Sequence, residues 1–97
     1  MAILKSDAEL LGEQGQRLGD GMIYVHLPRG LEREQDGSGT MSLKAWTPTE
    51  DPPAALQLPD GRRLAITVSR DALSDCSRNR VLRFQVRWPG AGLGARN

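Results

Sequence analysis

The fold of this 97-residue chain is indicated most clearly by VLRFQVRW, residues 81–88. Apolar and polar side chains alternate along this stretch, with Leu82, Phe84, Val86 and Trp88 on one face. Alternation with a period of two is typical of a β-strand that turns one face to a core. We therefore expect a strand over 81–88, with Trp88 in a structural position.

Upstream of this strand, four more short segments show the same alternation between breaks rich in proline and glycine. The turn Pro59-Asp60-Gly61 joins the last two of them, which predicts a β-hairpin. The four further strands that we expect span residues 22–27, 40–47, 54–58 and 63–69.

The first residues favour a helix. Ser6 and Glu9 have the spacing of a capping box, and Leu10, Leu11 and Leu18 can form a narrow apolar stripe behind it. We expect a short helix over residues 6–18 that ends at the following glycines.

The connections differ in character. Residues 29–39 are polar and end in Asp-Gly-Ser-Gly, so we expect an exposed loop there. Three prolines within 48–53 predict a second break. Residues 69–79 form a connection with room for one helical turn, and the glycine-rich residues 90–97 are typical of a flexible tail.

Together these elements predict a mainly β fold in a single domain over residues 1–89. A five-stranded small barrel, or a strongly bent antiparallel sheet with a short N-terminal helix, buries the apolar faces most economically. A lone cysteine excludes an internal disulfide, and no signal peptide or long apolar run is present, so we expect a cytoplasmic protein. Because so small a core is only marginally stable alone, we expect a homo-oligomer.

Charge is distributed unevenly. Residues 1–50 hold five basic and eight acidic side chains, a net charge of −3, whereas residues 51–97 hold eight arginines and four aspartates, a net charge of +4. No acid follows Cys76, and this block forms either a solvated face enriched in arginine by a GC-rich genome or a surface for anions. The candidate nucleic-acid-binding residues are Arg78, Arg80, Arg83 and Arg87.

Two aromatic residues accompany the arginines. By alternation, Tyr24 and Trp46 lie on the non-core side of their strands. Exposed aromatics beside arginine can stack single-stranded RNA bases, and they are equally typical of protein–protein interfaces. Packing of Tyr24 and Trp46 against the helix or a second subunit is the alternative, so we name them as interface candidates.

The sequence gives little support to catalysis. His26 and Cys76 could form a thiol–imidazole pair only if the fold brought them together, and nothing in the sequence does so. No metal-ligand spacing occurs, the paired carboxylates lie in polar loops, and the glycine clusters do not precede a helix that could hold a phosphate. We expect a protein that is not an enzyme and has no cofactor, no metal and no membrane association.

The order of elements, one helix followed by five strands, resembles the Sm-like family of small barrels. That family carries a signature with Asp and Asn after its third strand and a signature with Gly across its last two strands. Neither signature is found here at a matching position, and Arg78-Asn79-Arg80 is the nearest substitute for the second one. The resemblance implies a ring-forming RNA-binding protein and assigns no binding residue.

A second resemblance is to PilZ domains. Residues 29–33 fit their R-x-x-x-R motif, and Asp75-Cys76-Ser77 begins their D-x-S-x-x-G motif, in which Arg80 replaces the glycine. This resemblance implies binding of a cyclic dinucleotide.

The sequence therefore predicts a small binding or assembly module. Binding of single-stranded RNA through the arginine-rich block is the first hypothesis. An oligomeric protein–protein interaction module without a nucleic-acid role is the alternative, and cyclic dinucleotide binding is a minor one.

Overall fold

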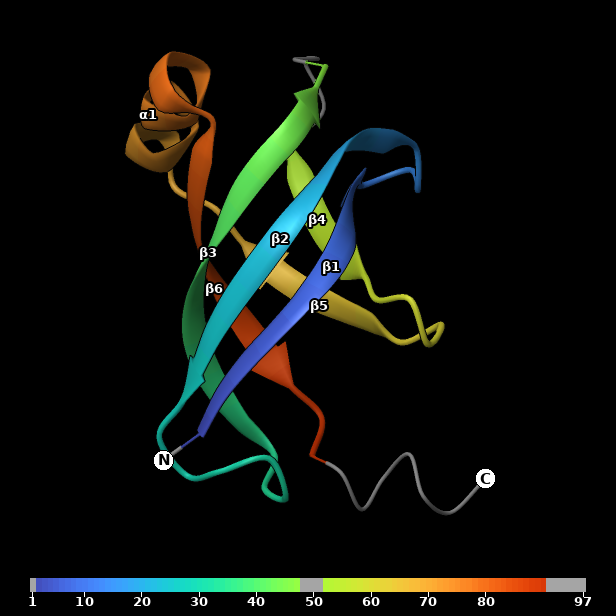
Figure 1. Cartoon of the computed structure of the whole chain (residues 1–97), viewed down its shortest axis with the longest axis vertical. Helices are drawn as coiled ribbons and strands as arrows, with labels where there is room; N and C mark the ends of the chain where they lie inside the picture. Colours follow the sequence, from blue (N-terminus) through green and yellow to red (C-terminus); the bar gives the residue numbers. More distant parts are fainter. Residues whose placement is uncertain (1, 48–51, 91–97) are drawn as a thin grey trace.

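Alternation of apolar and polar residues builds a closed barrel in the computed structural model, which describes residues 2–47 and 52–90. All neighbouring strands are antiparallel, and they close in the order β1-β2-β3-β6-β5-β4 (Figure 1). The elements are β1 (Ala2–Gly12), β2 (Arg17–Leu27), β3 (Gln35–Trp46), β4 (Pro53–Gln57), β5 (Arg63–Thr67), α1 (Arg70–Asn79) and β6 (Val81–Trp88).

The predicted class, a mainly β barrel with one short helix, is confirmed, but the helix predicted over 6–18 is wrong. Residues 2–12 form β1 instead, which pairs with β2 from Ala2 opposite Leu27 to Leu11 opposite Arg17. The barrel therefore has six strands rather than five. A capping box stabilises a helix by about 1 kcal/mol, which is less than the burial of Ala8 and Leu10 against the other strands provides.

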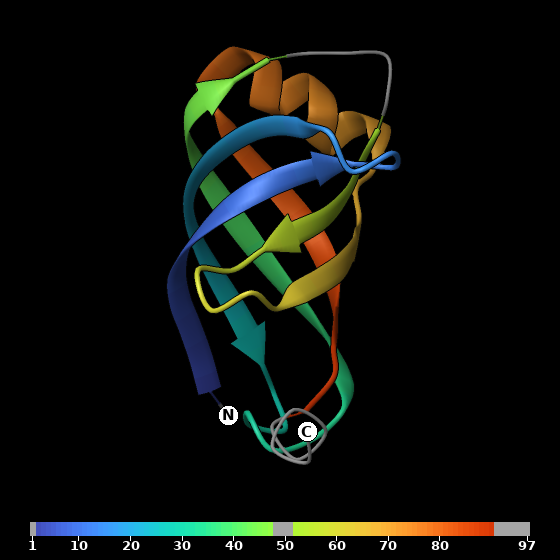
Figure 2. The ribbon, with the colours of Figure 1, turned by 90° about the vertical axis from the view of Figure 1, so that its right-hand side faces the viewer.

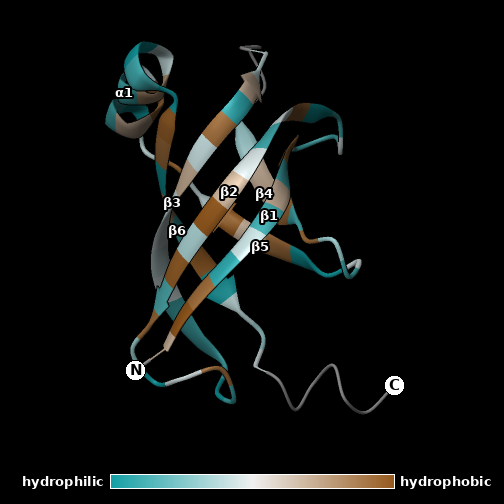
Figure 3. Ribbon diagram, in the orientation of Figure 1, coloured by the Kyte–Doolittle hydropathy of each residue, from teal (hydrophilic) through white to brown (hydrophobic). Residues whose placement is uncertain are grey.

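The core follows the alternation of the strands, which Figure 3 shows as brown and teal bands along each ribbon. Strand β6 spans the predicted residues, and its face with Phe84 and Trp88 is buried as expected. The indole Nε1 of Trp88 donates a hydrogen bond of 2.8 Å to the carbonyl oxygen of Leu31. The guanidinium of Arg62 lies 5.2 Å from the centre of the Trp88 ring. Trp88 thus joins β6 to the loop before β3.

Glycines on the inner side of β2 and β3 allow these long strands to bend around so small a core. A Cβ atom on Gly21 would lie 1.9 Å from the carbonyl oxygen of Ser42. A Cβ atom on Gly39 would lie 2.5 Å from the carbonyl oxygen of Tyr24 and 2.8 Å from the Phe84 ring. Only a residue without a side chain permits these approaches, which is the usual role of glycine at a bend in a barrel wall.

Part of the loop expected over 29–39 is strand. β3 begins at Gln35, and Gly37 and Gly39 lie on its inner side opposite Val86 and Phe84 of β6. The remaining loop is held by the buried Gln35 side chain, whose amide oxygen accepts a 2.9 Å hydrogen bond from the Arg29 N–H. The break expected over 48–53 falls mostly outside the described residues, as do residues 91–97 of the expected tail.

The connection after β5 contains ten helical residues, α1, rather than a single turn. The Ser69 hydroxyl caps the first turn by accepting the Ala72 N–H at 3.1 Å, and Arg80 closes the last turn in a left-handed conformation. Ala72 and Cys76 turn into the core, and Figures 1 and 2 both place α1 at one end of the barrel. In the described ranges, no helix is long and apolar enough to cross a membrane.

The close approach at Gly21 predicts a specific stability loss. Replacement of Gly21 by alanine forces the β2 and β3 backbones apart and should lower the free energy of unfolding by about 3 kcal/mol or more. Gly15 is the matched control: it has a φ of +82° but open space around it, so Gly15→Ala should cost only about 1 kcal/mol. Urea unfolding followed by circular dichroism measures both values, and equal losses would contradict the packing argument.

Candidate interaction surfaces

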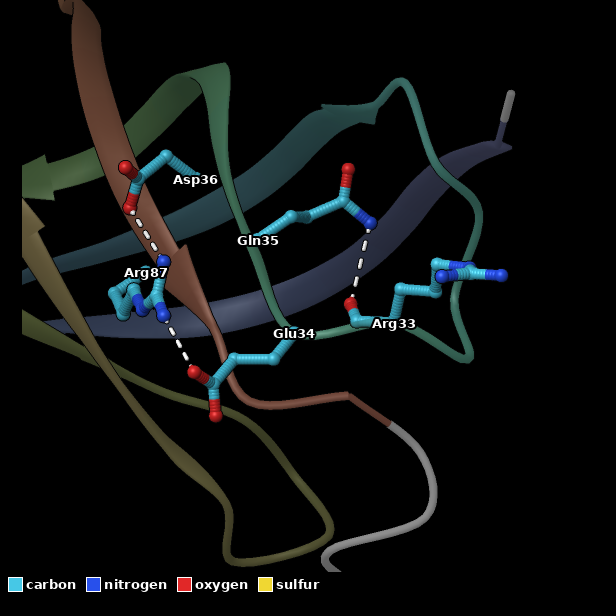
Figure 4. A network of polar contacts seen from close by, with 5 residues as sticks. All are labelled: Arg33, Glu34, Gln35, Asp36 and Arg87. Carbon is cyan, nitrogen blue, oxygen red and sulfur yellow. Dashed lines mark hydrogen bonds and ion pairs between the residues drawn. The ribbon is translucent and has the colours of Figure 1, made fainter.

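The two arginines predicted on the outer face of β6 lie there, and each has acidic partners from other elements. Arg83 contacts the Asp75 carboxylate of α1 at 2.8 Å. Arg87 contacts Glu34 at 2.5 Å and Asp36 at 3.2 Å (Figure 4). The hydrogen bond to Asp36 is the largest cause that raises the pKa of Arg87 above its ordinary value. No acid follows Cys76 in the sequence, but the fold brings carboxylates from other segments beside Arg83 and Arg87. These carboxylates partly neutralise the positive charge of the arginine-rich block.

The other two predicted arginines belong to the end of α1. Arg78 is exposed in the last helical turn, where a cation complements the helix dipole. The Arg80 backbone N–H closes the helix on the Cys76 carbonyl oxygen, and its guanidinium donates a 3.3 Å hydrogen bond to the Lys44 carbonyl. β6 runs from this end of the barrel toward the loop before β3 (Figure 1). Arg78 and Arg80 therefore lie just before β6, whereas Arg83 and Arg87 lie successively farther along it.

The two aromatic interface candidates have different environments. Tyr24 lies on the outer face as expected, is 42% exposed, and has the Lys5 ammonium 5.6 Å from its ring centre. Trp46 packs against the core, so its predicted outward orientation is wrong. The reason is an irregularity in the pairing of β2 with β3, where Asp20 and Gly21 face Ala45 and Leu43, so that Lys44 is skipped. The interface role of Tyr24 stays a prediction.

Trp46 also carries a buried polar atom. Its indole Nε1 is enclosed and has no hydrogen-bond partner among residues 2–47 and 52–90. An extra residue in one strand reverses the face of every residue after it. Alternation alone does not show where such a residue lies, so it predicted the wrong face for Trp46.

A groove of about 620 Å³ lies on the outer face of β2, β3 and β6 beside the start of α1. The register aligns two rows of side chains across it. One row contains Tyr24, Thr40 and Arg83, and the other contains His26, Ser38 and Gln85. We call this feature the outer-face groove.

The wall of the barrel is also incomplete beside β1. Only the last part of this strand, Glu9–Gly12, pairs with β4, whereas residues 2–8 pair with β2 alone. A recess of about 420 Å³ lies nearby and is lined by residues of β1, β2 and β3 together with the end of β4 and the turn after it. We call the edge of residues 2–8 that faces away from β2 the open β1 edge. Its backbone N–H and C=O groups are available to another strand. Residues 2–8, AILKSDA, show no alternation of apolar and polar side chains, so no local sequence signal indicated this edge.

The possible catalytic groups are not assembled. Cys76 is fully buried in the core, and burial raises the pKa of its thiol. His26 is exposed on the outer face of β2. Among the described residues, no group of three or more histidine, cysteine or carboxylate side chains could hold a metal ion.

The features behind the two family resemblances do not come together. The Sm-like order begins with a helix, but the residues predicted to form that helix belong mainly to β1. The only helix in residues 2–47 and 52–90 lies between β5 and β6. The PilZ-like Arg29 and Arg33 lie in the loop at one end of the barrel, and Asp75 and Ser77 lie on α1 at the other end (Figures 1 and 2). No known protein family, curated protein or solved structure matches the chain, so these surfaces are interpreted from their geometry.

The burial of Cys76 predicts its reactivity. With the thiol enclosed in the core and protonated at neutral pH, iodoacetamide should leave the folded protein unmodified over a period that fully alkylates it in urea. Mass spectrometry of intact protein measures the extent of reaction. Rapid alkylation of the folded protein would restore Cys76 as a candidate nucleophile.

Proposed function

We propose that this chain is an assembly module that binds a second copy of itself through the open β1 edge. The observation that supports this is the pairing of residues 2–8 with β2 alone, which leaves a long stretch at the start of β1 without a second neighbour. An unpaired strand edge exposes a row of N–H and C=O groups that readily accepts another strand. Two identical edges related by a twofold axis satisfy each other.

Side-chain charges select one register for this pairing. With Ser6 opposite Ser6 on the twofold axis, Lys5 of each copy lies opposite Asp7 of the other, and the pairing has two opposite-charge contacts. A register shifted by two residues places Lys5 opposite Lys5, which is repulsive. A further shift places Lys5 opposite the apolar Ile3. The edge is therefore complementary to itself in the first register.

The apolar side chains are consistent with the same arrangement. Leu4 is half-buried on the inner side of β1, and in this register it lies opposite Ala8 of the second copy. Ile3 is 67% exposed on the outer side, the largest exposure of any large apolar residue in the described ranges. Pairing covers part of both side chains, although a contact of a few residues gives a weak dimer.

A charge-reversal series tests the proposal. The wild-type protein should dimerise with rising concentration, as measured by analytical ultracentrifugation from the micromolar to the near-millimolar range. Lys5→Asp places like charges together twice and should weaken dimerisation about tenfold or more. Adding Asp7→Lys to it exchanges the two charges and should restore dimerisation to within about threefold of wild type.

The control is Arg70→Asp, which reverses an exposed charge on α1, away from the β1 edge, and should leave dimerisation unchanged. A wild-type protein that stays monomeric throughout would refute the proposal. A dimer that resists Lys5→Asp, or that the exchanged pair does not restore, would refute the edge and its register.

A further inference from the structure

The outer-face groove has a lining whose chemistry selects for anions. Its eleven lining residues include one guanidinium, that of Arg83, and no carboxylate. Hydroxyl groups of Ser38, Thr40 and Thr67 and the amide of Gln85 also line it. Such groups donate hydrogen bonds to phosphate oxygens, and a guanidinium binds phosphate through two parallel bonds.

The groove also has an aromatic surface at a defined separation from the cation. Tyr24, Thr40 and Arg83 lie in one row on three neighbouring strands, and two strand spacings correspond to about 10 Å. The Tyr24 ring is 42% exposed and can stack on a planar base. A nucleotide that stacks on Tyr24 can extend its phosphate along Thr40 toward Arg83.

Arg83 is available for this contact although it has a partner. The Arg83 guanidinium and the Asp75 carboxylate are 59% and 48% exposed, and an exposed pair contributes at most about 1 kcal/mol. A phosphate monoester carries more charge than a carboxylate, and both a monoester and the phosphodiester of RNA offer acceptor oxygens to the two N–H groups of a guanidinium, so either can compete with Asp75. Asp75 therefore competes with the ligand for Arg83.

We propose that the outer-face groove binds a nucleotide, with its base on Tyr24 and its phosphate on Arg83. The same chemistry occurs in free nucleoside monophosphates and in single-stranded RNA, so both are used as probes. This site lies on β2, β3 and β6 and adjoins the open β1 edge, because the Lys5 ammonium is 5.6 Å from the Tyr24 ring centre. Its occupation does not require the dimer.

Direct titration tests the proposal. We expect AMP or UMP, or a fluorescein-labelled octauridylate, to bind the wild-type protein, with dissociation constants measured by calorimetry and fluorescence polarisation. Binding of monophosphates indicates a free nucleotide, whereas binding of the octauridylate alone indicates RNA, and either result supports the site. Adenosine and inorganic phosphate, each with half of the recognised features, should bind at least about tenfold more weakly than AMP.

Variants locate the contact. Arg83→Gln and Tyr24→Ala should each weaken binding about fivefold or more, whereas Asp75→Asn should strengthen it about two- to fivefold because it removes the competing carboxylate. Arg87→Gln is the matched control, since Arg87 is on the same strand and ion-paired but does not line the groove. It should change binding less than twofold.

Three results would overturn the proposal. The first is absence of binding to every probe at low salt. The second is an equal loss in Arg87→Gln and Arg83→Gln, which would indicate general attraction to positive charge. The third is an Asp75→Asn variant that binds no better than wild type, a measurement that stays informative even if Arg83→Gln is unstable.

Discussion

The close approach of β2 to β3 at their inward-facing glycines is the constraint on which the rest of the structure depends. Strands of eleven and twelve residues can enclose a core this small only if they bend sharply. Gly21 and Gly39 permit the bend, because a side chain at either position would overlap the neighbouring backbone. The pairing of these two strands places Tyr24 beside Thr40 on one outer face.

The sequence predicted those parts of the barrel whose pattern is local. Strand β6 alternates without interruption, and its limits and buried face are as expected. The capping box at Ser6 misled because it is a local preference, whereas β1 is determined by pairing with β2, the next strand, and with β4, which is distant in sequence. Likewise, Arg83 and Arg87 belong to a stretch without acids, but pairing of strands and packing of α1 bring Asp75 and Asp36 beside them.

The proposed surfaces have different origins in the fold. The outer-face groove requires the register of three strands, which alternation does not specify, so its members could be predicted only as outward-facing residues. The open β1 edge results from incomplete closure between β1 and β4. The side chains on which the two proposals depend, those of Lys5, Asp7, Tyr24 and Arg83, lie outside the core, and neither surface uses the buried Cys76.

Hydrogen exchange along β1 tests most directly whether its edge is open in the monomer and covered by a second copy. In an antiparallel strand, alternate amides point to opposite neighbours. At low protein concentration, every second amide between Ile3 and Ala8 should exchange rapidly, and at high concentration these amides should become protected. Protection of all amides in this segment at every concentration, or rapid exchange of the alternate amides at every concentration, would contradict the account.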